Sequence, residues 1–106
     1  MTEVTKSPFG TMPDGHAIEL YTLRNARGTT VAVTTYGARL VSFTREVNGT
    51  PIDIVLGYRS GADYLRDTTS MGGVVGRHAN RIADGRVTIG GHTYQLEQNS
   101  GSRKQN

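Results

Sequence analysis

Apolar and polar residues alternate with a period of two through most of this chain. The alternation predicts β-strands, because successive side chains of a strand point to opposite faces of a sheet. It is clear in the run from His16 to Leu23, where Ile18 and Leu20 fall on one face. Six strands are predicted in all, near residues 16–24, 29–36, 39–47, 51–56, 86–90 and 92–97.

Short turn-forming segments separate these runs. Pro13-Asp14-Gly15 is a typical turn sequence, and Gly90-Gly91 between two strand-like runs indicates a tight hairpin. Only residues 60–67 are typical of a helix, one or two turns long, with Ser60 as the N-cap and Asp63 as its partner three residues on. The regular spacing of strands and turns predicts an all-β fold, an antiparallel sandwich or barrel.

Length and composition narrow the class of protein. The chain has 106 residues and a net charge of +3, which is typical of a single domain with a modest hydrophobic core. It has no cysteine, which is compatible with a reducing compartment. Its basic residues form no stripe interleaved with aromatic residues, so nucleic-acid binding is not expected. The chain contains no apolar run long enough to cross a membrane, and its first ten residues lack the apolar core of a secretory signal, so we expect a cytoplasmic protein.

The segment Gly76-Arg77-His78-Ala79-Asn80-Arg81-Ile82 is the most unusual part of the sequence. Arginine offers several planar donors and asparagine both a donor and an acceptor, which suits a ligand rich in hydroxyl groups. The alternative is that these side chains only tie down irregular loop backbone. The spacing matches neither of the common glycine-rich phosphate-binding motifs.

The other polar candidates are weaker. Three histidines lack the spacing of metal ligands, and no metal site is expected from them: His16, His78 and His92. Asp53 and Asp63 are a conceivable acid–base pair, but Asp53 stands in an apolar run and is expected to bond backbone or an arginine instead. Tyr58 and Tyr64 are expected to pack over the sheet rather than to stack on a ligand.

The segment from Gly76 to Ile82 resembles the GR-x-ANRI signature of aldose 1-epimerases, the galactose mutarotases. The surrounding chain is similar to the family as well. Asp53-Ile54-Val55-Leu56-Gly57-Tyr58 resembles its D-x-VLGY segment, and residues 83–96 resemble the hairpin that follows the signature. The resemblance spans about Phe9 to Asn99.

The resemblance implies an antiparallel β-sandwich that binds free aldoses such as galactose and glucose in a cleft. Enzymes of this family interconvert α and β anomers without metal or nucleotide: a histidine protonates the ring oxygen while a glutamate takes the proton of the anomeric hydroxyl. Asn80 and Arg81 match positions that hydrogen-bond the sugar. Arg77 lies in the same motif, and His78 is not expected to be catalytic. The implied ligand is an aldose monosaccharide; no cofactor and no protein partner is inferred.

The family pattern is lost after Asn99, where relatives continue into N-G-x-N-x-L-H-G-G. The catalytic histidine, a sugar-binding aspartate and the basic glutamate have no counterpart here, so no residue of this chain is expected to be catalytic. We therefore expect residues 1–98 to be the N-terminal strands of a truncated sandwich, and residues 99–106 a divergent, disordered tail. Unpaired edges and an uncovered apolar face are expected. Two other hypotheses stay open: a non-catalytic sugar-binding β module, and a structural or interaction domain.

Overall fold

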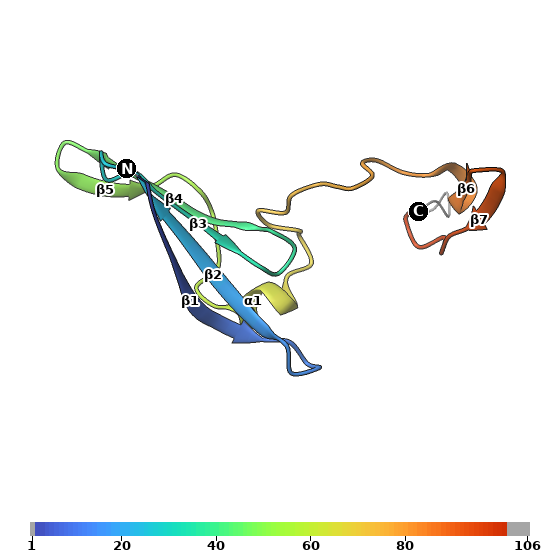
Figure 1. The fold of residues 1–106 in the computed structure, drawn as a ribbon, viewed down its shortest axis with the longest axis horizontal. Helices are drawn as coiled ribbons and strands as arrows, with labels where there is room; N and C mark the ends of the chain where they lie inside the picture. Colours follow the sequence, from blue (N-terminus) through green and yellow to red (C-terminus); the bar gives the residue numbers. More distant parts are fainter. Residues whose placement is uncertain (1, 102–106) are drawn as a thin grey trace. The chain divides into compact units, whose positions relative to one another are not determined.

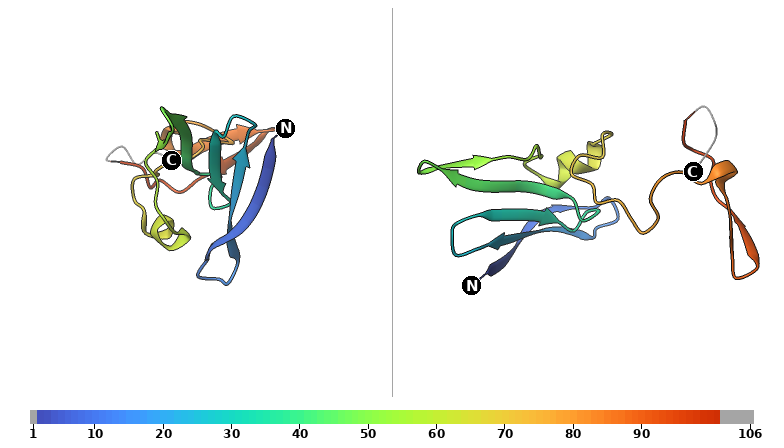
Figure 2. Two further views of the ribbon diagram at one scale, coloured as in Figure 1. Left: turned by 90° about the vertical axis from the view of Figure 1, so that its left-hand side faces the viewer. Right: turned by 90° about the horizontal axis from the view of Figure 1, so that it is seen from above.

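The structure is a computed structural model that describes residues 2–101, and these form two compact units that divide between Val74 and Val75. The first unit is a five-stranded antiparallel sheet with the strands in chain order, as Figures 1 and 2 show. Its elements are β1 (Glu3–Thr11), β2 (Ala17–Arg24), β3 (Thr30–Thr34), β4 (Leu40–Val47), β5 (Thr50–Asp53) and the short helix α1 (Gly61–Arg66). The second unit contains the 3₁₀ turn η1 (Ala83–Gly85) and a hairpin of β6 (Arg86–Ile89) and β7 (His92–Gln95).

All six predicted strands are present, and the antiparallel all-β prediction is confirmed. The strand predicted near 51–56 is shorter than expected. It ends at Asp53, whose Oδ1 accepts the backbone N–H groups of Phe43 and Val55 at 3.0 Å each. A side chain here takes the place of a ladder partner, which fits the prediction that Asp53 bonds backbone.

β1 was not predicted from the sequence. Its residues pair with β2 from Glu3↔Arg24 to Thr11↔Ala17, with an irregularity between Pro8 and Gly10. The strand lies at the edge of the sheet, where a proline is tolerated because an edge strand has a ladder partner on one side only. Few residues of β1 are apolar, so its sequence lacks the apolar–polar alternation from which the other strands were predicted.

The core of the first unit lies between α1 and one face of the sheet. Ile18, Ala32, Thr34, Val41 and Tyr64 are the buried residues that form it. Tyr64 is fully enclosed, and its ring meets Tyr58 edge-on at 5.1 Å between centroids. This confirms that both tyrosines pack over the sheet. The cap of α1 is also as predicted, since Ser60 Oγ accepts the N–H of Asp63 at 3.3 Å.

A buried ion pair ties the chain after α1 to the start of β4. Arg39 Nη1 lies 2.6 Å from Asp67 Oδ2, and the Asp67 side chain is 0% exposed. Asp67 also accepts the Met71 N–H at 2.9 Å, and Leu40 donates its N–H to the Gly72 carbonyl at 2.9 Å. Gly72 has φ +67°, and a Cβ there would lie 2.2 Å from the Leu40 oxygen, so only glycine fits this close approach.

The Asp67 network predicts a loss of stability in acid. The Thr69 hydroxyl and backbone N–H groups, together with Arg39, hold the pKa of Asp67 well below its usual range. Because the folded pKa is lowered, the stabilisation is complete above the unfolded pKa of about 3.9 and is lost as the pH falls toward the folded value. We expect Asp67→Asn to lower the urea midpoint at pH 7 by about 1 M or more and to flatten its fall below pH 4.

Urea titrations of the chain at several pH values between 7 and 2.5 measure this effect. Asp14→Asn is the control, because Asp14 is largely exposed and an asparagine oxygen can still accept the His16 N–H. An Asp67→Asn chain with the midpoint and acid limb of the parent would show that the ion pair contributes nothing.

Candidate functional site

The segment around Asn80 and Arg81 belongs to the second unit and contains no helix or strand. Residues 76–81 are all exposed. Asn80 adopts the left-handed backbone conformation, with φ +69°, which asparagine tolerates better than most residues. Its Oδ1 accepts the N–H of Arg81 at 2.8 Å.

Arg81 reaches across the second unit to the end of the described chain. Its Nε donates to Ser100 Oγ at 3.0 Å, and the Arg81 side chain is exposed. The Asn80 contact is of the kind expected if the segment's side chains tie down loop backbone, whereas the Arg81 contact joins two side chains. Asn80 and Arg81 are consecutive residues of one exposed segment, and both present polar groups to solvent.

The hairpin that follows the segment is built as the sequence predicts. Gly90 and Gly91 have φ values of +56° and +81°, the conformation that a two-residue turn of this hand requires. The amide of Gln95 donates to the carbonyl oxygen of Asp84 at 2.9 Å, and so fastens η1 to β7. The hydrogen bond therefore anchors the chain directly after residues 76–82 to the hairpin of the same unit.

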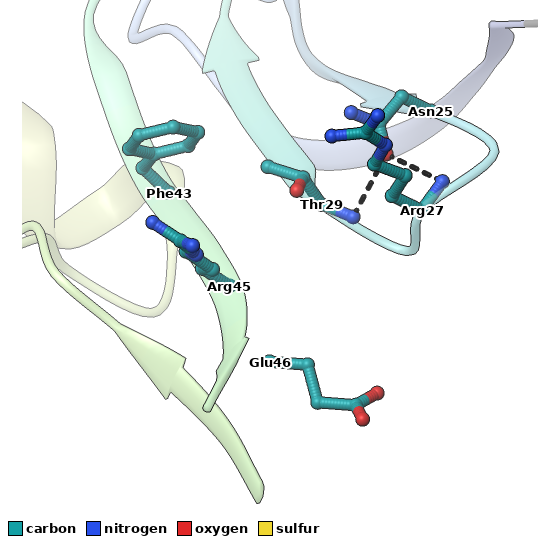
Figure 3. A pocket seen from close by; sticks show the side chains of 6 residues that line it. All are labelled: Asn25, Arg27, Thr29, Phe43, Arg45 and Glu46. Atoms are coloured by element: carbon teal, nitrogen blue, oxygen red, sulfur yellow. Dashed lines mark hydrogen bonds between the residues drawn. The ribbon is translucent and has the colours of Figure 1, made fainter. Parts of the chain in front are cut away.

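The first unit carries, among its described residues, an open hollow lined by Asn25 and Phe43 and another lined by Thr5 and Thr22, and neither includes a predicted site residue. The larger, about 450 Å³, is shown in Figure 3 and is lined by Asn25, Arg27, Thr29, Phe43, Arg45 and Glu46. Sequence reasoning singled out none of these side chains as a site. Asn25 Oδ1 accepts the N–H groups of Arg27 and Thr29, so its polar atom serves the turn. The hollow therefore combines a structural asparagine with exposed charges of both signs.

The contacts of the weaker candidates, two aspartates and two histidines, do not bring them together into a site. The carboxylate of Asp63 pairs with Ser60 and Arg66, whereas Asp53 bonds backbone, so the two have separate partners. His16 and His92 are exposed, as predicted. Among residues 2–101 no group of three or more metal-ligating side chains comes together. Within the same range no helix has the length and apolar character to cross a membrane.

The fold and the candidate segment therefore define an antiparallel β protein with an exposed Gly-Arg-x-Ala-Asn-Arg segment that follows the sheet and precedes the hairpin in the sequence. The family model for aldose 1-epimerase matches residues 19–106. Because this match covers most of the chain, the protein belongs to the aldose 1-epimerase family.

Comparison with individual proteins gives the same family. Galactose mutarotase of Mus musculus is 38% identical over 101 residues, which cover 93% of this chain and 29% of the relative. Aldose 1-epimerase of Escherichia coli is 37% identical over 90 residues, covering 84% of this chain and 26% of that protein. The crystal structure of galactose 1-epimerase from Lactobacillus acidophilus aligns with the whole chain at a TM-score of 0.74 and 26% identity. That alignment covers 30% of the crystallised chain.

The chain thus spans less than a third of the length of the relatives it matches and corresponds to an N-terminal portion of them. The family match runs to residue 106, beyond the end of the motif resemblance at Asn99. The division into residues 1–98 and a disordered tail stays a prediction, and residues 102–106 lie outside the described residues. The sugar-binding roles of Asn80 and Arg81 also stay predictions.

Proposed function

We propose that this chain supplies sugar-binding groups to an aldose 1-epimerase that interconverts the α and β anomers of aldoses such as galactose and glucose. The observation that carries the proposal is the motif from Gly76 to Ile82, which lies within the family match. The names of the relatives support galactose as one substrate. A cytoplasmic location is part of the proposal.

Asn80 and Arg81 are the proposed sugar ligands. The Asn80 amide can both donate and accept, as each sugar hydroxyl does, and the Arg81 guanidinium donates in a planar fork. Within the second unit Asn80 Oδ1 accepts the backbone N–H of Arg81, and Ser100 Oγ accepts the Nε–H of the Arg81 side chain. Such contacts would hold the pyranose in place while its ring opens and closes.

The chemistry itself needs groups beyond these two. One acid must protonate the ring oxygen, and one base must remove the proton of the anomeric hydroxyl; the ring then opens, the C1–C2 bond rotates and the ring closes on the other face. In the proposed enzyme these groups, a histidine and a glutamate, belong to the part of the protein that this chain does not match. The chain's own contribution is to bind and orient the sugar.

Arg81→Ala tests the proposal in a full-length chimera. The first part of Mus musculus galactose mutarotase is replaced by residues 1–98 of this chain, and mutarotation is followed by polarimetry. A charge-assisted hydrogen bond to the sugar contributes about 1.5–3 kcal/mol, so Arg81→Ala should lower kcat/KM by about one to two orders of magnitude.

Arg86→Ala is the matched control, because Arg86 is an exposed arginine of the same unit at the start of β6. It should leave kcat/KM unchanged. An unchanged kcat/KM in Arg81→Ala would make Arg81 a structural residue and contradict the proposal. A folded chimera that binds galactose but does not interconvert its anomers would favour a sugar-binding module instead.

A further inference from the structure

The chain that follows β7 returns along the turn η1. Leu96 donates its N–H to the carbonyl oxygen of Gly85 at 2.7 Å. The side-chain amide of Gln98 donates to the carbonyl oxygen of Asp84 at 2.9 Å. We call residues 96–100 the return segment. As this segment advances, its partners step backward along the chain, so it runs antiparallel to η1.

The next contact in this order brings Ser100 to Arg81. Ser100 Oγ accepts the Nε–H of Arg81 at 3.0 Å, across 19 positions of the sequence. The two stretches of backbone are in close contact, since a Cβ at Gly85 would lie 2.9 Å from the Leu96 carbonyl oxygen. The place of Ser100 beside Arg81 is therefore set by the course of the backbone as well as by the two side chains.

The guanidinium group of Arg81 carries five N–H donors in a rigid plane. Ser100 takes the donor on Nε, and the other four lie on the two Nη atoms at the far end of the plane. A fixed acceptor at Nε restricts the rotation of the plane. Because Arg81 is exposed, its long side chain would otherwise sample many rotamers in water.

We infer that Ser100 is a positioning residue of the proposed epimerase. Its hydroxyl holds the Arg81 guanidinium so that the two Nη atoms donate to adjacent hydroxyl oxygens of the aldose. Part of the ordering of Arg81 is then complete before the sugar binds, which favours binding. The inference rests on the proposed sugar role of Arg81, and Ser100 acts through Arg81 without a sugar contact of its own.

The hydrogen bond is tested first in the chain itself, without sugar. The Nε–H group of Arg81 gives a signal in a proton–nitrogen correlation NMR spectrum, and the signal is assigned by its loss in Arg81→Ala. We expect Ser100→Ala to shift this signal and to speed its exchange with water. Ser100→Thr keeps the hydroxyl and should restore both. Thr93→Ala is the control, because the Thr93 hydroxyl belongs to the same unit but bonds to Thr88.

The functional role is tested in a chimera with residues 1–101 of this chain in place of the matched part of Mus musculus galactose mutarotase. The net contribution of one hydrogen bond predicts that Ser100→Ala lowers kcat/KM for galactose by about three- to ten-fold. Ser100→Thr should restore kcat/KM, and Thr93→Ala should leave it unchanged. In an Arg81→Ala chimera, Ser100→Ala should have no further effect, because the serine acts through the arginine.

The inference and the sugar role of Arg81 fail in different ways. An Nε–H signal that does not change in Ser100→Ala would overturn the inference alone. So would a chimera that loses activity in Arg81→Ala but not in Ser100→Ala. Equal losses from Ser100→Ala with and without Arg81 would make Ser100 a structural residue. If Arg81→Ala leaves kcat/KM unchanged, the sugar contact is wrong and the role of Ser100 fails with it.

Discussion

Tyr64→Ala is expected to unfold the first unit. The Tyr64 side chain is fully enclosed and belongs to a small core with Ile18, Ala32, Thr34 and Val41. It contacts Phe9 and Tyr58 through its ring, and its hydroxyl accepts the Tyr58 N–H at 3.2 Å. Removing a buried aromatic ring costs about 3–5 kcal/mol, which is most of the stability of a domain at the low end of the usual range.

Circular dichroism with urea and thermal denaturation measures this loss. Tyr64→Phe keeps the ring and should cost only about 1 kcal/mol, the value of one hydrogen bond. Tyr94→Ala is the control, since Tyr94 is 52% exposed on β7 and its loss should change the midpoint little. A Tyr64→Ala chain with a cooperative transition near that of the parent would show that the core does not depend on this ring.

The 106-residue chain alone is expected not to catalyse mutarotation. Catalysis needs an acid and a base, each within about 3 Å of its proton, on either side of one sugar ring. His78 is close in sequence to Asn80 and Arg81 but is exposed. Asp84 is also close to Arg81 in sequence, but its side chain is exposed and it forms part of the turn η1. Neither lines the two hollows described on the first unit.

Polarimetry of freshly dissolved α-glucose or α-galactose, with and without the purified chain, measures this directly. The rate should equal the uncatalysed rate at every chain concentration, while Mus musculus galactose mutarotase serves as the positive control. A rate increase that saturates with sugar and disappears in Arg81→Ala would reveal a self-sufficient site and overturn the prediction.

Local patterns predicted the fold class well because they depend on neighbouring residues. Alternation located β2, β3, β4, β6 and β7 to within about two residues. The turn at Gly90-Gly91 and the Ser60 cap of α1 follow from the backbone and side-chain chemistry of a few adjacent residues. Likewise, the family was recognisable from the short block around Asn80 and Arg81, because its residue types and order are specific.

The long-range contacts were not predictable in the same way. β1 is held by its pairing with β2 rather than by its own alternation, and β5 ends where the Asp53 side chain replaces a ladder partner. The pairing of Arg39 with Asp67 joins residues 28 positions apart, and the sequence offers no rule for choosing Asp67 among the carboxylates.

The sequence by itself determined that this protein is an antiparallel β chain of the aldose 1-epimerase family with a polar segment at Asn80 and Arg81. Only the tertiary structure decided which face of the sheet is enclosed. Both faces carry apolar residues along β2 and β3, and the sequence pattern treats them alike. The position of Tyr64 over Ala32 and Val41 breaks that symmetry, because one short helix can cover only one face and leaves Leu23 and Val31 open on the other.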